Sequence, residues 1–422
     1  MSWFISTLPR PKFNRDLPMS RCYAIKGIRR VQTGAGELGF SLIELMVGML
    51  VSIICVLGMM AAFAAFEGPK RTTSSGDDAQ QNGSYSLFEL ERQIRTAGSG
   101  LTQGNKYGLW GCFITGYAGG AKVIPSSSAL PAPFSAWPQS TPATPVNLVA
   151  MPVLIASGGT DANGNDASDT IAVVAGNPAG TVFKSAVQGT STGSLLVLDN
   201  ALGIANGDYM VGATTAGNCV MGKTSVVTLS TNQATLSAND TPPTGLVGAQ
   251  YVFDMGQQPV FSLYGVNVDA TTGNSTLVTY DLLRRSGNTT QPIADGIVAI
   301  KALYGVDDGT TTAGIPGSGV ANDDIIDEWV KPTGTWSIQS IMATQASAAQ
   351  AFRQIKAIRL VVVARSQLPE RQTDYGTGAT VLKVFQDLPA NQQYKITTQT
   401  AYRYKVYDTT IPIRNALITK LF

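Results

Sequence analysis

One apolar run, residues 40–66, constrains this chain of 422 residues more than any other feature. It is 27 residues long and contains a single charge, Glu44. About 20 apolar residues cross a bilayer core as a helix, so the run can span a membrane with some tilt. The alternative is a secretory signal cut near Ala61–Ala65, but the apolar core of such a signal is only about 7–15 residues long. We therefore predict a transmembrane helix at residues 40–66.

The charges on the two sides of this run predict its orientation. Residues 1–39 hold seven Lys and Arg side chains against Asp16 and Glu37, whereas the rest of the chain holds 23 basic and 26 acidic residues. Because positive charge accumulates on the cytoplasmic side of a membrane helix, we expect a cytoplasmic N-terminus. The chain would then be a single-pass protein of the inner membrane with a periplasmic C-terminal domain.

The overall composition argues against several classes of activity. The chain contains no histidine, which removes catalytic triads and metal sites that depend on it. Its net charge of +2 gives no reason to expect nucleic-acid binding. The glycine-rich stretches lack the setting of a phosphate-binding or dinucleotide-binding loop. We therefore predict no enzyme, no catalytic residue and no cofactor.

Two acidic stretches raise the question of calcium binding. Residues 161–166 (DANGND) form one, and Asp307 and Asp308 with the acidic residues of 323–328 form the other. The first stretch does not match an EF-hand loop, which has glycine at its sixth position and glutamate at its twelfth. We favour solvated loops over a metal site in both places.

The junction between the basic leader and the apolar run contains three informative residues. Gly39 ends the leader, Phe40 begins the run, and Glu44 lies four residues further on. A carboxylate inside a membrane helix is costly and by default marks a functional contact. The alternative is a glutamate near the interface that reaches the headgroups.

Residues 39–45, GFSLIEL, resemble the signal of type IV prepilins and pseudopilins. The resemblance implies that a prepilin peptidase cuts after Gly39 and that Phe40 becomes the N-methylated terminus of the mature protein. Glu44 would then neutralise the new amine of a neighbouring subunit, which removes two desolvation penalties together. Leaders of this class are often shorter than residues 1–39, so Met19 is an alternative start.

A second helical pattern follows the apolar run. Leu87, Leu90 and Ile94 recur at helical spacing, and glycines at 98 and 100 end the pattern. Together the two segments predict one N-terminal helix of about 55–60 residues, whose amphipathic part at 67–98 covers a sheet. Because Pro69 removes a backbone hydrogen bond, we expect this helix to bend or break near Gly68 or Gly76.

From residue 99 to residue 422, short β-rich runs replace the helical periodicity, which predicts one β-rich periplasmic domain. The continuously apolar run at 358–363 predicts a central strand, and residues 347–356 predict a short helix before it. The fold class is α+β: a long membrane-spanning pilin helix packed on an antiparallel β-sheet domain. The expected strands are residues 170–175, 194–198, 225–229, 250–253, 259–266, 276–283, 297–304, 358–364 and 401–407.

Two stretches interrupt this pattern of strands. Residues 121–150 are rich in proline and serine, which predicts an exposed loop. Residues 176–250 are long enough for an insertion or a second β-rich lobe in a domain of unusual size. Cys112 and Cys219 are the two cysteines of the exported part, and they either form a disulfide or remain buried thiols. Such a bridge closes a long loop and contributes about 4–5 kcal/mol in the chain-entropy model.

Four segments resemble the PilW family of type IV pilus minor pilins. They are residues 295–308 (DGIVAIKALYGVDD), 357–366 (AIRLVVVARS), 166–174 (DASDTIAVV) and 409–415 (TTIPIRN). The resemblance implies a minor pilin that joins other minor pilins and the major pilin, and that primes assembly at the filament tip. Its partners would include the prepilin peptidase/methyltransferase and, in many systems, a pilus-tip adhesin.

Two alternatives to this reading remain open. A type II secretion pseudopilin of the J type would carry the same N-terminal signal. A membrane-anchored exported enzyme or carbohydrate-binding β-domain would instead keep residues 40–66 as an uncleaved anchor.

Overall fold

The structure is a computed structural model, and it divides the chain into two compact units, Met1–Phe63 and Ala64–Phe422. Gly39 and the whole leader lie outside the described residues, as do residues 161–163 of the first acidic stretch. The described residues are 40–101, 109–125, 129–137, 148–160, 164–176, 184–189, 191–214, 218–246, 248–269, 271–283, 287, 289–311, 317–369 and 378–418.

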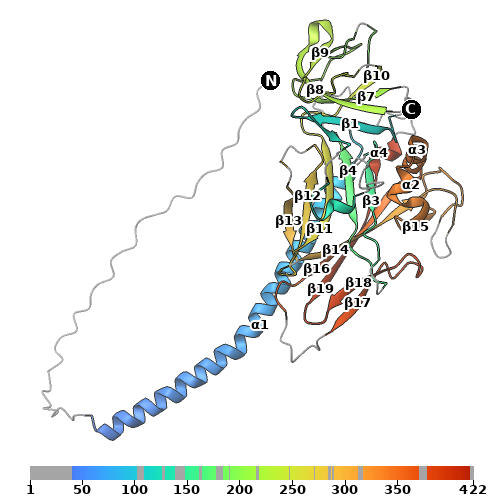
Figure 1. Ribbon diagram of the computed structural model, residues 1–422. Coiled ribbons are helices and arrows are strands. Elements are labelled where there is room, and N and C mark those ends of the chain that lie inside the picture. Colours follow the sequence, from blue (N-terminus) through green and yellow to red (C-terminus); the bar gives the residue numbers. More distant parts are fainter. Residues whose placement is uncertain are drawn as a thin grey trace, which may run out of the picture. The chain divides into compact units, whose positions relative to one another are not determined.

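The first element is a single helix, α1 (Leu42–Thr96), of 55 residues. This confirms the predicted length, and of the predicted bend or break only the break is wrong, because the helix continues through Gly68, Pro69 and Gly76 (Figure 1). A proline inside a helix removes one backbone hydrogen bond. The many hydrogen bonds of the turns on both sides remain, so the loss of one bond does not end the helix.

A five-stranded antiparallel sheet forms one part of the β domain, with the strand order β13-β12-β11-β4-β3. Three of its strands, at 170–175, 259–266 and 276–283, were predicted from the sequence. The bounds are β3 (Val153–Ala156), β4 (Thr170–Ala175), β11 (Val260–Val268), β12 (Ser275–Asp281) and β13 (Gln291–Asp295).

A four-stranded antiparallel sheet has the order β15-β14-β16-β19. Its strand β16 lies between β14 and β19, which confirms the central strand predicted at 358–363. The helix α3 (Gln345–Gln354) leads directly into β16, as predicted, and Thr344 and Ser347 cap its first turn. The strand bounds are β14 (Ile297–Val306), β15 (Glu328–Val330), β16 (Ile355–Arg365) and β19 (Tyr404–Pro412).

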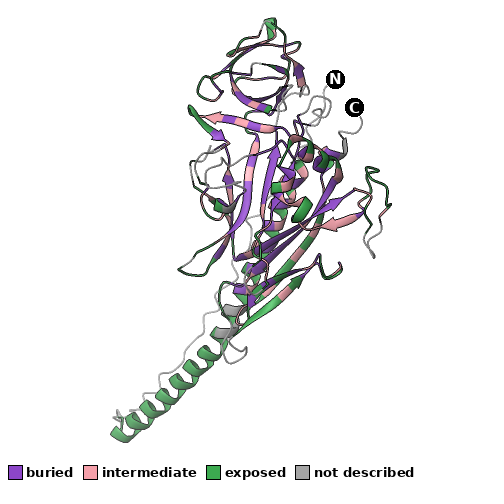
Figure 2. Ribbon diagram, turned by 45° about the vertical axis from the view of Figure 1, so that its right-hand side comes forward, coloured by how far each residue is buried: buried purple, intermediate pink, exposed green. Residues whose placement is uncertain are grey.

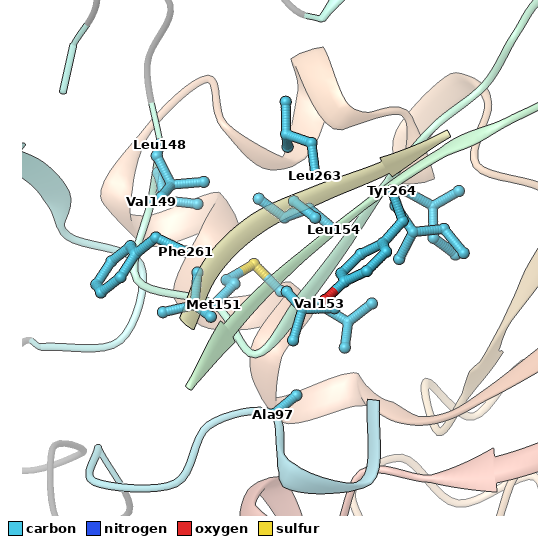
Figure 3. Close-up of a cluster of buried hydrophobic side chains, with 14 of the residues drawn as sticks. Ala97, Leu148, Val149, Met151, Val153, Leu154, Phe261, Leu263 and Tyr264 are labelled. Atoms are coloured by element: carbon cyan, nitrogen blue, oxygen red, sulfur yellow. The ribbon is translucent and has the colours of Figure 1, made fainter. Parts of the chain in front are cut away.

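The hairpin β17 (Ala379–Val384)–β18 (Tyr394–Gln399) packs against the four-stranded sheet through a cluster that includes Phe385, Tyr394 and Val361. The remaining short helices are α2 (Ile338–Ile341), α4 (Arg414–Ile418), η2 (Phe134–Ala136), η3 (Leu229–Thr231) and η4 (Gly334–Trp336). One large core joins α1 to both sheets. Figure 3 shows part of that core, with Leu154 and Leu263 on one side of the sheet and Val153 and Tyr264 on the other.

An eight-stranded sheet includes the strands of residues 184–254, which we call the lobe. The lobe has a hydrophobic cluster of its own, formed by residues such as Leu196, Met210 and Val252. Figure 1 shows its strands gathered at one end of the β domain. The bounds are β1 (Phe113–Ala118), β2 (Ala121–Ile124), β5 (Lys184–Ala186), β6 (Leu195–Val197), β7 (Tyr209–Thr214), β8 (Asn218–Thr228), β9 (Gln233–Leu236) and β10 (Ala249–Asp254).

The prediction of an exposed loop at residues 121–150 is wrong for the described part of that stretch. Residues 121–124 form β2, and Phe134, Trp137 and Val149 are almost completely buried. Proline and serine disfavour regular structure, but they do not determine whether the neighbouring aromatic side chains reach the core. With the helix and the two antiparallel sheets, the predicted α+β fold class is confirmed.

The second half of α1 packs against the β domain through the predicted stripe. Leu90 and Ile94 are fully buried, and Leu87 packs against the same core. The Tyr407 hydroxyl on β19 donates to the Gln80 carbonyl at 3.0 Å, and the Asn82 amide donates to the Asp295 carbonyl at 3.0 Å. These contacts attach the helix to two different sheets.

Gly83 faces the Tyr407 ring so closely that a Cβ at this position would overlap the ring, whereas Gly76 of the same helix has open space. We predict that Gly83→Ala lowers the free energy of unfolding by about 1–3 kcal/mol because it overpacks this contact. Gly76→Ala, the matched control, should raise it by up to about 1 kcal/mol through helix propensity. Urea denaturation of the detergent-solubilised protein measures both, and equal effects would contradict the packing argument.

Candidate functional site

The first half of α1 is an apolar surface that its own chain leaves exposed. The segment Leu42–Glu67 has a mean hydropathy of 2.5, and none of it is buried. Figure 2 shows these turns as exposed, and Phe40, just before the helix, is 80% exposed. An apolar surface of this size requires lipid or another protein. One apolar helix near the N-terminus fits a membrane anchor.

The structure places two of the three junction residues predicted from the sequence. Phe40 precedes the helix, and Glu44 lies in the first helical turn. The backbone N–H of Glu44 donates to the Ser41 carbonyl at 2.9 Å, and that of Leu45 donates to it at 3.1 Å. A carboxylate is favoured at this end of a helix because the helix dipole is positive there. Within the described residues the Glu44 carboxylate has no hydrogen bond or ion pair, so it is accessible to a group from outside the chain.

A buried ion pair joins the two main sheets of the β domain. Lys301 of β14 and Asp169, just before β4, are both fully buried, and their Nζ and Oδ1 atoms are 2.7 Å apart. The Asp169 carboxylate also accepts the backbone N–H groups of Gly158 and Ala302, each at 3.1 Å. Lys301 lies over the Tyr394 ring with its Nζ 4.3 Å from the centroid. Every charged atom therefore has a partner, which burial of an ion pair requires.

The second acidic stretch, which we call the acidic clasp, combines buried and exposed carboxylates. Asp307 and Asp327 are fully buried, which corrects the expectation of a solvated loop for these two residues, whereas Asp323 and Asp324 are exposed as expected. Lys356 of β16 lies 2.7 Å from Asp324 and 3.4 Å from Asp307. Backbone N–H groups use the remaining oxygens, for example Gly309 N–H to Asp327 at 2.8 Å. Among the described residues, no group of three or more acidic or cysteine side chains is arranged to hold a metal ion.

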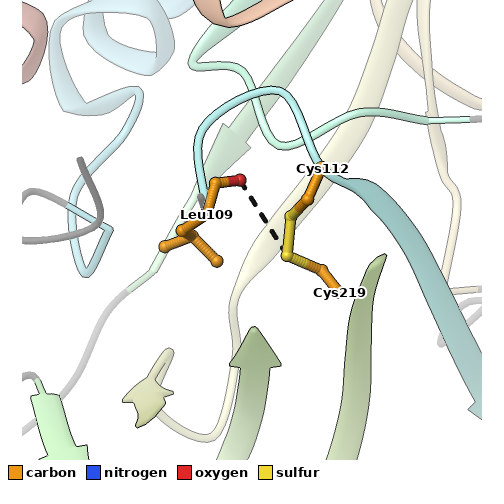
Figure 4. The surroundings of a disulfide bond; sticks show 3 residues. All are labelled: Leu109, Cys112 and Cys219. Atoms are coloured by element: carbon orange, nitrogen blue, oxygen red, sulfur yellow. Dashed lines mark hydrogen bonds between the residues drawn. A yellow bond between two sulfur atoms is a disulfide. The ribbon is translucent and has the colours of Figure 1, made fainter. Parts of the chain in front are cut away.

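Cys112 and Cys219 form a disulfide that connects the chain before β1 to strand β8 of the lobe (Figure 4). The two cysteines are 107 residues apart, both are fully buried, and their Cα atoms are 5.6 Å apart. The Leu109 carbonyl oxygen lies 3.9 Å from the Cys219 sulfur. Strands β1 and β8 pair in parallel beside this bridge, so it fixes the lobe to the N-terminal part of the β domain.

Both members of the buried ion pair lie in segments that resemble the PilW family, but their contact was not predicted. Asp169 is part of the segment 166–174, and Lys301 is part of the segment 295–308. A lysine within an otherwise apolar strand was the signal, because a fully buried lysine needs a partner. The identity of the partner could not be predicted, since the two residues are 132 positions apart.

The helix and the sheets define an α+β protein with a membrane-type N-terminal helix and a large antiparallel β domain. A family model described as "Type IV Pilus-assembly protein W" (PilW) matches residues 263–415. The match runs from β11 to α4, and it contains Lys301 and the acidic clasp but neither α1 nor the lobe. No curated protein and no solved structure matched significantly.

This match confirms the predicted resemblance to the PilW family of type IV pilus proteins. It supports a role in type IV pilus assembly, with interactions inside the pilus system. The family is a pilus-assembly family and is not a known family of enzymes.

We predict that Lys301→Met lowers the free energy of unfolding by about 3–5 kcal/mol, because it leaves the Asp169 carboxylate buried without its counter-charge. The double variant Lys301→Met/Asp169→Asn should lose less than the two single variants together, since it removes both charges. The measurement is urea denaturation of each protein.

The pair Arg92–Glu89, at 2.8 Å on α1, provides the control because its Arg92 side chain is exposed. Arg92→Met should cost less than about 1 kcal/mol. If Lys301→Met costs no more than Arg92→Met, the buried pair does not join the sheets in the way described.

Proposed function

We propose that this chain is a minor pilin that a prepilin peptidase cuts after Gly39. The mature protein would begin at Phe40, carry an N-methyl group there, and enter the filament through residues 40–66. The observation that carries this proposal is the apolar half of α1, which continues without a break into a helix packed on a PilW-type domain. A separate secretory signal would not need that continuity, because it is removed from the folded domain.

The position of Glu44 supports a specific contact in the assembled filament. Cleavage after Gly39 would create a positively charged amine at Phe40, inside an apolar environment. Glu44 has no partner among the described residues, so a neighbouring subunit can supply the opposite charge. Pairing the amine of one subunit with the Glu44 carboxylate of the next neutralises two charges that are each costly in a membrane. The same pairing would set the axial stagger between subunits.

The cellular arrangement and the partners follow from this proposal. The basic leader would remain in the cytoplasm, α1 would cross the inner membrane, and the β domain would lie in the periplasm before entry into the pilus. The partners would be the prepilin peptidase/methyltransferase, other minor pilins, the major pilin and a tip adhesin. The match to a pilus-assembly family favours this role over that of a J-type secretion pseudopilin.

We predict that Glu44→Gln leaves processing intact but lowers the recovery of partner pilins at least about tenfold. A lost pairing energy of only about 1.4 kcal/mol already corresponds to a factor of ten. Co-purification of pilins from cells that produce the tagged variant measures this recovery, and the electrophoretic mobility of the variant reports its cleavage.

Glu67→Gln is the matched control, because Glu67 is the exposed carboxylate at the other end of the apolar segment. Its recovery of pilins should equal that of the unchanged protein. Unchanged recovery with Glu44→Gln would refute the charge-neutralisation argument. Equal losses with both variants would show that the effect is not specific to residue 44.

A further inference from the structure

A polar groove lies where α1, the lobe and the five-stranded sheet meet. It encloses about 560 Å³, a volume within the range of about 300–1,000 Å³ that is common for ligand sites. Its floor comes from β11, β12 and β13, and its walls come from the lobe and from Gln93 of α1. Of its described lining residues, Val260 alone has no polar side-chain group.

The pairing of the strands places the polar side chains of the floor in two adjacent rows. Tyr264 pairs with Thr279, and Thr279 pairs in turn with Gln291, so three polar side chains form a row across three strands. Ser262 pairs with Asp281 in the adjacent row. Side chains two residues apart on a strand share one face, so both rows point to the same side of the sheet.

The floor is organised before any ligand binds. The Tyr264 side chain is almost completely buried, and it lies between Ser262 on its own strand and Thr279 directly opposite on β12. Burial of the ring and the nearby Glu89 carboxylate raise the pKa of Tyr264 to about 12. The hydroxyl is therefore protonated, and uncharged, throughout the physiological pH range.

The lobe supplies a wall that is fixed in place. The Lys223 ammonium of β8 lies 5.2 Å from the centroid of the Tyr209 ring of β7. Gln257, just after β10, donates to the Asn206 carbonyl at 3.1 Å. The disulfide holds β8 at Cys219, four residues before Lys223. None of these wall residues falls within the segment that the PilW model matches.

The chemistry of the lining limits what this groove can bind. Its described residues contain one cation, Lys223, and one anion, Asp281, so it offers no net attraction to a polyanion. Its apolar lining is limited to Val260 and the rings of Tyr209 and Tyr264, which is less than an amphipathic helix needs. Carboxamides and hydroxyls, which both donate and accept hydrogen bonds, dominate instead. Neutral sugars carry several hydroxyl groups on each ring, and these hydroxyls also donate and accept hydrogen bonds.

We propose that this groove binds a neutral oligosaccharide, held by the Gln258 and Gln291 carboxamides on its two sides and by the hydroxyls of its floor. Both glutamines are exposed and lie on opposite sides of the groove, one next to the lobe and one on the edge strand β13. This binding activity goes beyond the proposed processing and filament entry, because no described lining residue of the groove lies in the apolar half of α1.

The test is binding of the full chain to an array of neutral, sialylated and sulfated oligosaccharides, in a detergent without a sugar headgroup. The neutral oligosaccharide that binds best is then titrated in solution against Gln258→Ala/Gln291→Ala and against Gln350→Ala. Gln350 is an exposed glutamine on α3, away from the groove lining, and serves as the control. Loss of two hydrogen-bonding side chains should weaken binding about tenfold or more, whereas the control should bind normally.

A neutral ligand also predicts that affinity is unchanged when the salt concentration is raised. Binding of acidic oligosaccharides alone, or binding that salt abolishes, would overturn the proposal. So would the absence of any bound neutral oligosaccharide, or equal affinity in the double variant and the control. Loss of partner pilins in the double variant without any sugar binding would make the groove a contact between subunits.

Discussion

Helix α1 has one half that is exposed and apolar and another half that packs on the β domain, and continuous backbone hydrogen bonds run through both. In hydrocarbon no water is present to satisfy exposed peptide groups, so a single crossing segment has to be helical. The apolar half meets this requirement and leaves its side chains exposed. The other half packs Leu90 and Ile94 into the core and uses Gly83 to approach Tyr407 closely. The attachment of the apolar segment to the β domain depends on this helix, because its second half contacts both main sheets.

Polar contacts then hold the β domain together at points where hydrophobic packing alone would not specify an arrangement. The Asp169–Lys301 pair joins the five-stranded and four-stranded sheets, and the Lys356–Asp307 contact fastens a long acidic loop beside them. An unpaired charge in either place would be strongly destabilising, so these contacts select one relative position of the elements. The Cys112–Cys219 bridge attaches the lobe covalently.

The sequence predicted those features that local pattern determines. Hydropathy located the apolar half of α1, alternation and apolar runs located strands such as β4 and β16, and spacing located the Leu90–Ile94 face of α1. It led us to expect a bend or a break near Gly68 or Gly76, and no break is present, because one missing hydrogen bond is small beside those of a long helix. It did not find the ion pair or the polar groove. Both bring together residues far apart in the chain, and only the register and packing of the sheets make them neighbours.

The central claim, that this protein with a PilW-type segment at residues 263–415 is processed as a prepilin, depends on the junction at Gly39 and Phe40. The most direct measurement is the N-terminal mass of the protein recovered from cells with and without a prepilin peptidase. We predict a chain that begins at N-methylated Phe40 when the peptidase is present and an uncleaved leader when it is absent. A leader that stays intact in the presence of the peptidase, or a cut near Ala65, would contradict the account.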